Sequence, residues 1–86
     1  MIKVRCAGHI RSSLGTEELT LEIAEISSSE LLDRLRMLGK SDPRLGFTKY
    51  NTLIIVNGGE VYTAAADDRL LRDGDTVFLL PFSHGG

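Results

Sequence analysis

Hydrophobic and polar residues alternate at the start of the chain. Ile2, Val4 and Cys6 occupy every second position of the segment IKVRC, which is the spacing of a strand with one buried face. The segment LTLEIAE, residues 19–25, alternates in the same way. The stretch between them, residues 8–18, is mostly polar and contains two glycines. It predicts a hairpin loop that joins two antiparallel strands.

The pattern becomes helical in residues 27–40. An apolar stripe recurs there at spacings of three and four residues, and it consists of Leu31, Leu32, Leu35 and Leu38. Ser27 followed by Glu30 is a candidate capping box, and either of the next two serines is an alternative cap. Gly39 is a candidate C-terminal stop. We therefore expect one main helix.

The second half of the chain predicts strands again. TLIIV, residues 52–56, is apolar on both faces and is typical of a central strand. Asn57-Gly58 is a strong tight-turn signal, and EVYT after it is expected to form a short edge strand. Residues 64–75 predict one helical turn and then an Asp73-Gly74 turn, and TVFLLP, residues 76–81, is the last strand.

Alternation divides the last strand into two faces. We assign Val77 and Leu79 to the core, and Phe78 and Leu80 to the opposite face. Because one main helix covers only one side of a sheet, the second face predicts an exposed apolar interaction site. Alternatively, the loop of residues 41–52, with its two aromatic side chains, folds over that face.

Composition sets the class of protein. The chain has 86 residues, a formal net charge of −2 and one cysteine, so we expect one domain without an internal disulfide. The two signs of charge are interspersed without a basic stripe, and nucleic acid is not an expected partner. The sequence contains no apolar run of signal-peptide or membrane-span length. We expect no membrane contact and a cytoplasmic location.

No enzymatic constellation is present in the sequence. Ser83 and His84 are neighbours, and extended neighbours point to opposite sides. Cys6 and His9 are only two metal ligands, whereas a structural zinc site takes four. No Gly-rich phosphate loop opens a helix. We therefore expect no metal site, no cofactor bound by this chain, no ATP site of its own and no catalysis.

The remaining candidate is the segment after the last strand. Residues 82–86 end in Gly85-Gly86, and we expect a domain over residues 1–81 followed by a flexible tail over residues 82–86. Five extended residues span at most about 17 Å. Two glycines lack side chains and have wide backbone freedom, so the tail can enter a narrow channel. Adenylation of the carboxylate of Gly86 would convert it into a reactive acyl group.

The order of elements and the last thirty residues resemble the ubiquitin-like β-grasp family, in particular the MoaD/ThiS sulfur carriers. The motif residues are Val56-Asn57-Gly58, Leu71, Asp73-Gly74-Asp75, Val77 and Pro81. A histidine before the two glycines, His84, is more similar to the ubiquitin-related modifiers. The resemblance implies an α+β fold in which a mixed four- to five-stranded sheet packs on one main helix.

The resemblance also implies a function for Gly86. A ubiquitin-activating-type enzyme would adenylate it with ATP, and a sulfurtransferase or cysteine desulfurase would supply sulfur for a thiocarboxylate. That sulfur would serve molybdopterin, thiamin or tRNA thiolation. The alternatives are a protein modifier joined to lysines through Gly86, a small non-catalytic subunit paired with a molybdopterin synthase large subunit, and a β-grasp binding module that is never activated.

Partner binding is assigned to one strand face and to the tail. Ile55 joins Phe78 and Leu80 through similarity to ubiquitin-like strands. The full set of expected partner-binding residues is Ile55, Phe78, Leu80, Phe82, Ser83, His84 and Gly85.

Overall fold

The structure is a computed structural model that describes residues 1–39 and 47–82. Its elements in chain order are β1 (Ile2–Cys6), α1 (Gly8–Leu14), β2 (Glu18–Leu21), β3 (Glu25–Ser27), α2 (Ser28–Leu38), β4 (Thr52–Val56), β5 (Glu60–Tyr62), β6 (Leu70–Arg72) and β7 (Thr76–Pro81). Neither helix in these ranges is long and apolar enough to cross a membrane.

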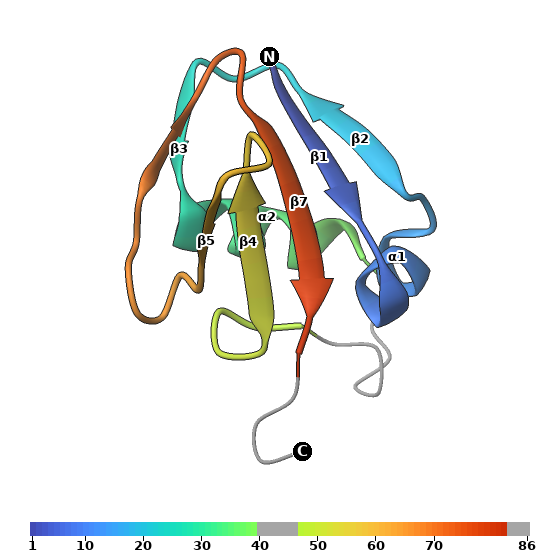
Figure 1. Ribbon diagram of the computed structural model, residues 1–86. Coiled ribbons are helices and arrows are strands. Elements are labelled where there is room, and N and C mark those ends of the chain that lie inside the picture. Colours follow the sequence, from blue (N-terminus) through green and yellow to red (C-terminus); the bar gives the residue numbers. More distant parts are fainter. Residues whose placement is uncertain (40–46, 83–86) are drawn as a thin grey trace.

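A mixed five-stranded sheet packs on the main helix. Its strand order is β2-β1-β7-β4-β5, so β7 lies in the middle. β7 runs parallel to β1 and antiparallel to β4. Figure 1 shows α2 crossing one side of this sheet. The predicted α+β fold, with a mixed sheet on one main helix, is confirmed.

The helix α2 follows the predicted pattern except at its end. The Ser27 hydroxyl accepts a hydrogen bond from the backbone N–H of Glu30 at 3.2 Å, which confirms the predicted cap. Three leucines of the stripe are buried, namely Leu31, Leu32 and Leu35. Leu38, the fourth member of the stripe, is 67% exposed, so the buried part of the stripe ends before it. It is the last helical residue and lies with Leu21 beside the edge strand β2, beyond the closely packed part of the core.

The predicted hairpin loop over residues 8–18 is wrong, because most of it forms the short helix α1. Ile10 and Ser13 are buried at a spacing of three residues. Gly15 ends the helix at φ +76°, and its N–H donates to the carbonyl of Arg11 at 2.8 Å. A polar segment with only one fully buried apolar side chain carries too little periodicity to predict a helix.

A second, two-stranded sheet was also missed. β3 pairs with β6 in antiparallel register, and the predicted strand over residues 19–25 therefore ends at Leu21. The turn predicted at Asp73-Gly74 is present, with Gly74 at φ +95°. A single helical turn precedes β6, where the N–H of Asp67 donates to the carbonyl of Thr63 at 3.0 Å.

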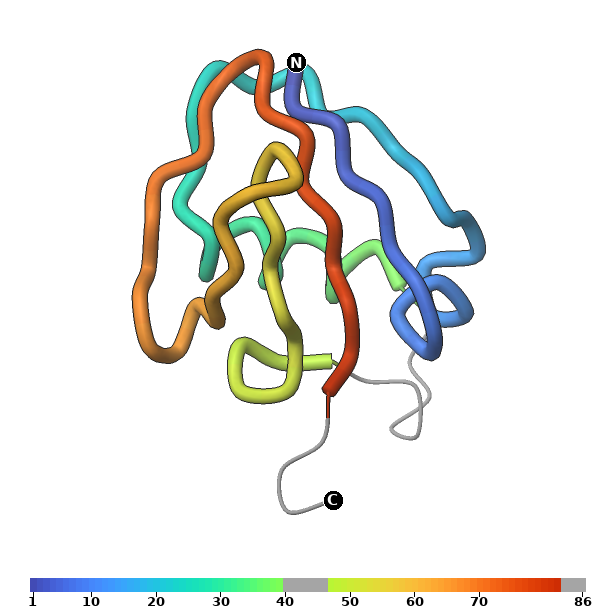
Figure 2. The backbone as a smooth tube through the Cα atoms, in the orientation of Figure 1, coloured from blue at the N-terminus to red at the C-terminus, as the bar shows by residue number. Residues whose placement is uncertain are grey.

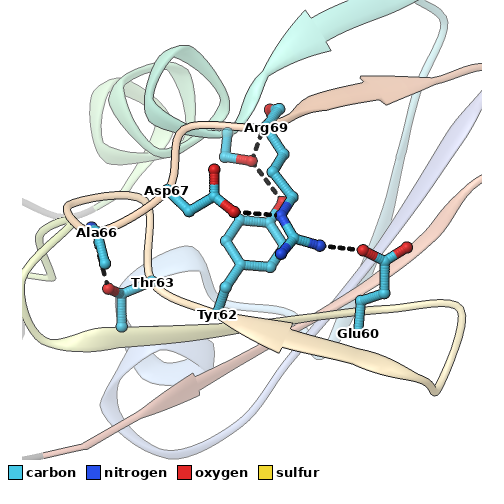
Figure 3. Close-up of polar contacts among 7 residues, drawn as sticks. Glu60, Tyr62, Thr63, Ala66, Asp67 and Arg69 are labelled. Atoms are coloured by element: carbon cyan, nitrogen blue, oxygen red, sulfur yellow. Dashed lines mark hydrogen bonds and ion pairs between the residues drawn. The ribbon is translucent and has the colours of Figure 1, made fainter.

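A polar network ties β5 to α2 and to the segment before β6. The hydroxyl groups of Tyr62 and Ser28 lie 2.6 Å apart, and Ser28 also donates to the carbonyl of Arg69 at 2.8 Å. Figure 3 shows the Arg69 side chain between Glu60 and Asp67. The Arg69 guanidinium lies 4.6 Å from the centre of the Tyr62 ring. Burial raises the pKa of Tyr62, so its hydroxyl stays protonated at neutral pH.

Candidate functional site

The central strand β7 presents one face to the core and the other outward. Val77 and Leu79 are fully buried, as predicted. Phe78 and Leu80 lie on the other face and are half-buried. This division follows from the twofold repeat of a strand.

The strand register defines an outer patch of five apolar residues. Ile55 lies opposite Phe78, and side chains directly opposite one another share a face. The register adds two residues that the sequence did not indicate: Leu53 opposite Leu80, and Val61 opposite Ile55. The outer patch consists of Leu53, Ile55, Val61, Phe78 and Leu80. Only the pairing of strands reveals the two missed members, because sequence alone does not give register.

The two aromatic residues proposed to cover this face do not do so. Phe47 is 1% exposed. It belongs to the hydrophobic core on the helix side of the sheet. Tyr50 is 61% exposed. Residues 40–46 of the same loop lie outside the described residues.

Positive charge borders the outer patch on the β1 side. Arg5 lies opposite Phe78, and Lys3 lies opposite Thr76. Both basic side chains are exposed. The Arg5 guanidinium lies 3.7 Å from the Glu18 carboxylate, an exposed pair that contributes little to stability. A partner on this face would therefore meet apolar side chains flanked by cations.

The end of β7 is held on two sides. Gly8 has φ +61°, and a Cβ there would lie 2.7 Å from the Cγ atom of Pro81. The N–H of Phe82 donates to the carbonyl of Asn51 at 2.9 Å. The Asn51 side chain in turn accepts bonds from the N–H of Thr48 at 2.7 Å and from the hydroxyl of Thr52 at 3.1 Å. Figure 2 shows α1 and the turn before β4 at the same end of the molecule as the end of β7.

Four predicted site residues lie outside the described residues. They are Ser83, His84, Gly85 and Gly86. Phe82 is the last residue described, and it is half-buried. The described part of the chain therefore ends one residue after β7.

The cysteine is poorly suited to nucleophilic chemistry. Cys6 is 4% exposed, and its thiol donates to the carbonyl of Thr16 at 3.5 Å. Burial raises its pKa, opposed in part by the positive charge of Arg11, so little thiolate is present at neutral pH. Within residues 1–39 and 47–82, no three His, Cys, Asp or Glu side chains are placed to hold a metal ion.

Comparison with solved structures identifies the fold. The small archaeal modifier protein 1 (SAMP1) from Methanosarcina acetivorans superimposes with a TM-score of 0.57 at 24% identity, over 99% of this chain and 95% of that one. The Sulfolobus solfataricus Urm1 gives a TM-score of 0.54 at 21% identity, over 93% of this chain and 99% of that one. The chain has the ubiquitin-like β-grasp fold. No family model matches the sequence, and no curated protein matches it.

Both comparisons include nearly the full length of each chain, so the short helix α1 and the small β3–β6 sheet lie within the compared lengths. At these identities the likeness establishes the fold, and the chemistry must be argued from the residues.

Proposed function

We propose that this protein is a carrier whose Gly86 carboxylate is activated by a partner enzyme with ATP. The observation that carries the proposal is the position of the end of β7. Gly8 closely approaches Pro81 there, the carbonyl of Asn51 accepts a bond from the N–H of Phe82, and the outer patch lies beside these contacts. A partner that binds the patch would keep Gly86 within about 17 Å of Phe82, which is the reach of an extended tail.

The two structural neighbours support this proposal. One is named as a small modifier protein, and the other carries the name Urm1. Their names agree with the resemblance of the sequence to sulfur carriers and ubiquitin-related modifiers. The proposal for this chain rests on its own Gly85-Gly86 sequence and on the placement of β7.

The proposed chemistry starts at the terminal carboxylate. A carboxylate oxygen of Gly86 attacks the α-phosphorus of ATP, pyrophosphate leaves, and an acyl-adenylate forms. A persulfide on a sulfurtransferase or cysteine desulfurase then attacks the carbonyl carbon, and AMP leaves. A thiol cleaves the resulting sulfur–sulfur bond, which leaves a thiocarboxylate on Gly86 and a disulfide on the donor. The chain supplies the acyl group and the docking surface, and its partners supply catalysis.

A pyrophosphate exchange assay tests the first step. The chain ending at Gly86 is mixed with the ubiquitin-activating-type enzyme from the same genome, ATP and labelled pyrophosphate. We expect label to enter ATP. A variant with one alanine added after Gly86 should give no exchange, because its carboxylate is displaced from the reacting position. Equal exchange by both forms, or by neither, would contradict the proposal.

A second outcome, attachment to lysines, is favoured by the name of the first structural neighbour. After activation, a lysine amine would attack the carbonyl carbon of Gly86 and form an isopeptide bond. The last basic residue that trypsin cleaves after is Arg72, so digestion would leave residues 73–86 on each modified lysine. Peptides carrying that remnant in expressing cells would support the modifier function, and sulfur on an otherwise free Gly86 would support the carrier function.

A further inference from the structure

A cleft lies between the helix α2 and the turn before β4. It has a volume of about 350 Å³, and its walls include Ser29, Asp33 and Arg36 of α2 and Thr48, Lys49 and Tyr50 of the turn. The α2 residues are four and three positions apart, so they share one face of the helix. Because α2 crosses only one side of the five-stranded sheet (Figure 1), the cleft is on the side away from the outer patch.

The turn that forms one wall of the cleft is fixed by its own hydrogen bonds. The N–H of Asn51 donates to the carbonyl of Thr48 at 3.3 Å, and the N–H of Tyr50 donates to the hydroxyl of Thr48 at 3.1 Å. Lys49 is exposed on this turn, and its ammonium group lies 5.5 Å from the centre of the Tyr50 ring. The turn therefore presents a cation at the cleft.

Positive charge exceeds negative charge among the side chains that line the cleft. Arg36 pairs with Asp33 on the same helix at 3.3 Å, which leaves Lys49 as the second cation. In the described part of the chain, Lys49 takes part in no ion pair. The neighbouring Asp68 carboxylate accepts bonds from the N–H and the hydroxyl of Ser29 at 2.9 and 2.6 Å. One further carboxylate beside Lys49 would balance the charge of the cleft.

The start of the tail lies next to this turn. The N–H of Phe82 donates to the carbonyl of Asn51 at 2.9 Å, which continues the register of β4 and β7. Residues paired in this way have Cα atoms about 5.5 Å apart, and Asn51 is at most about 7 Å from Lys49 along the chain. Phe82 is thus within about 13 Å of Lys49, and residues 83–86 reach about 14 Å when extended. The terminal carboxylate can therefore reach the cleft.

We propose that residues 83–86 of the free protein dock in this cleft and pair the Gly86 carboxylate with the Lys49 ammonium group. The two terminal glycines carry no side chains, so they fit between α2 and the turn. The docked tail points to the helix side of the sheet, whereas the proposed activating enzyme binds the outer patch on the opposite side. Activation then requires release of the tail, because only the undocked fraction can react.

Two forms of the chain that differ only at the terminus test the docking. One ends in the Gly86 carboxylate, and the other ends in the carboxamide, which has no charge. Their amide chemical shifts are compared at low protein concentration. We expect differences at Lys49 and also at Asp33 and Arg36, which belong to α2 and are remote from the tail in sequence. This comparison uses no enzyme, so its result is independent of whether Gly86 is activated.

Two charge-removing variants identify the cation that binds the tail. Lys49→Gln removes the proposed partner of the carboxylate. Arg34→Gln is the matched control, since Arg34 is an exposed cation of α2 that lines a different groove. The differences at Asp33 and Arg36 should fall by half or more in Lys49→Gln and persist in Arg34→Gln. Added salt at about 1 M should also reduce them, because it screens exposed charges.

The rate of pyrophosphate exchange at low protein concentration measures the consequence for activation. We expect Lys49→Gln to exchange about twofold to fivefold faster than the unmodified chain, which is the range that one exposed ion pair supplies. Arg34→Gln should exchange at the unmodified rate. Equal rates for Lys49→Gln and the unmodified chain would overturn the restraint on activation.

Three spectral results would overturn the docking itself. The first is a set of differences confined to Phe82 and the tail, and the second is a set at the outer patch instead of the cleft. The third is a set of differences at the cleft that grows with protein concentration, because the tail of a second copy would then occupy the cleft.

Discussion

At the scale of single residues, the Cys6 thiol can be distinguished from the thiocarboxylate proposed for Gly86. Its thiol is buried, and burial raises its pKa, so the thiolate, which is the form that attacks alkylating agents, is scarce at neutral pH. We expect iodoacetamide at pH 7.5 to label folded protein several-fold more slowly than unfolded protein. The rate should rise only as the pH passes above the ordinary range of a thiol.

Because Cys6 is expected to react slowly, rapid alkylation can report on sulfur carried by Gly86. In protein loaded with sulfur, rapid labelling at pH 7.5 should fall on the tryptic peptide of residues 73–86. Labelling of the peptide of residues 6–11 should stay slow. Rapid labelling of Cys6 in the folded protein would show that its environment is more open than the structure indicates.

Leu80 tests the docking role of the outer patch. Leu80→Asp places a charge in a half-buried apolar site next to the tail. Full burial of such a side chain by a partner contributes roughly 1.5–3 kcal/mol. We therefore expect the activating enzyme to bind Leu80→Asp about tenfold more weakly or worse, measured by calorimetry.

Thr76→Asp is the matched control for this change. Thr76 is on the same strand and the same face, but it is exposed and lies at the end of β7 away from the tail. It should bind nearly as the unmodified chain does. If Leu80→Asp unfolds the domain, Leu80 contributes to folding rather than to docking; if both variants bind equally, the enzyme does not use the outer patch.

At the scale of elements, the close approach of α1 to Pro81 positions the end of β7. Gly8→Ala would force a Cβ atom against Pro81 and would also strain a backbone at φ +61°. Gly58→Ala is the matched control for Gly8→Ala, since Gly58 also has a positive φ, +74°, but has open space around it. The left-handed conformation alone costs an L residue roughly 1–2 kcal/mol.

We expect Gly8→Ala to lower the midpoint of thermal unfolding more than Gly58→Ala does. It should also lower the rate of activation per folded molecule, because the end of β7 is displaced. Gly58→Ala should leave that rate unchanged. Similar losses for the two variants in both measurements would show that contact with Pro81 has no special role.

The bond between Tyr62 and Ser28 joins β5 to the start of α2. Tyr62→Phe removes the hydroxyl, while Ser28 keeps its bond to the carbonyl of Arg69. We expect a loss of about 0.5–1.5 kcal/mol in the free energy of unfolding by urea. A larger loss would mean that the whole network with Arg69 collapses, and no loss would mean that the hydroxyl is satisfied equally well by water.

The elements also show which parts of the fold can be predicted from sequence patterns. Periodicity predicted β1 and α2, and short apolar runs predicted β4 and β7, because each of these elements buries several side chains. α1 buries mainly Ile10, and β6 buries only Leu71 of its three residues. Elements this short owe their form to tertiary contacts and local turns, which a single sequence does not display.

At the scale of the whole molecule, the candidate site combines predictable and unpredictable parts. Alternation placed Phe78 and Leu80 on the face opposite Val77 and Leu79, which were assigned to the core. Leu53, Val61 and the contact of Gly8 with Pro81 depend on strand register and on close approach of segments far apart in sequence. The same limitation applies to Leu38, which lies outside the core although it belongs to the helical apolar stripe.

The most direct test of the account is the intact mass of the protein after reaction. The chain ending at Gly86 is incubated with the ubiquitin-activating-type enzyme from the same genome, ATP, a persulfide-loaded cysteine desulfurase and a thiol that cleaves the acyl disulfide, with an ATP-free control. The account predicts an ATP-dependent mass increase equal to the replacement of one oxygen by sulfur, confined to residues 73–86. An unchanged mass would contradict the account, provided that the same enzymes are shown to be active on a known carrier protein.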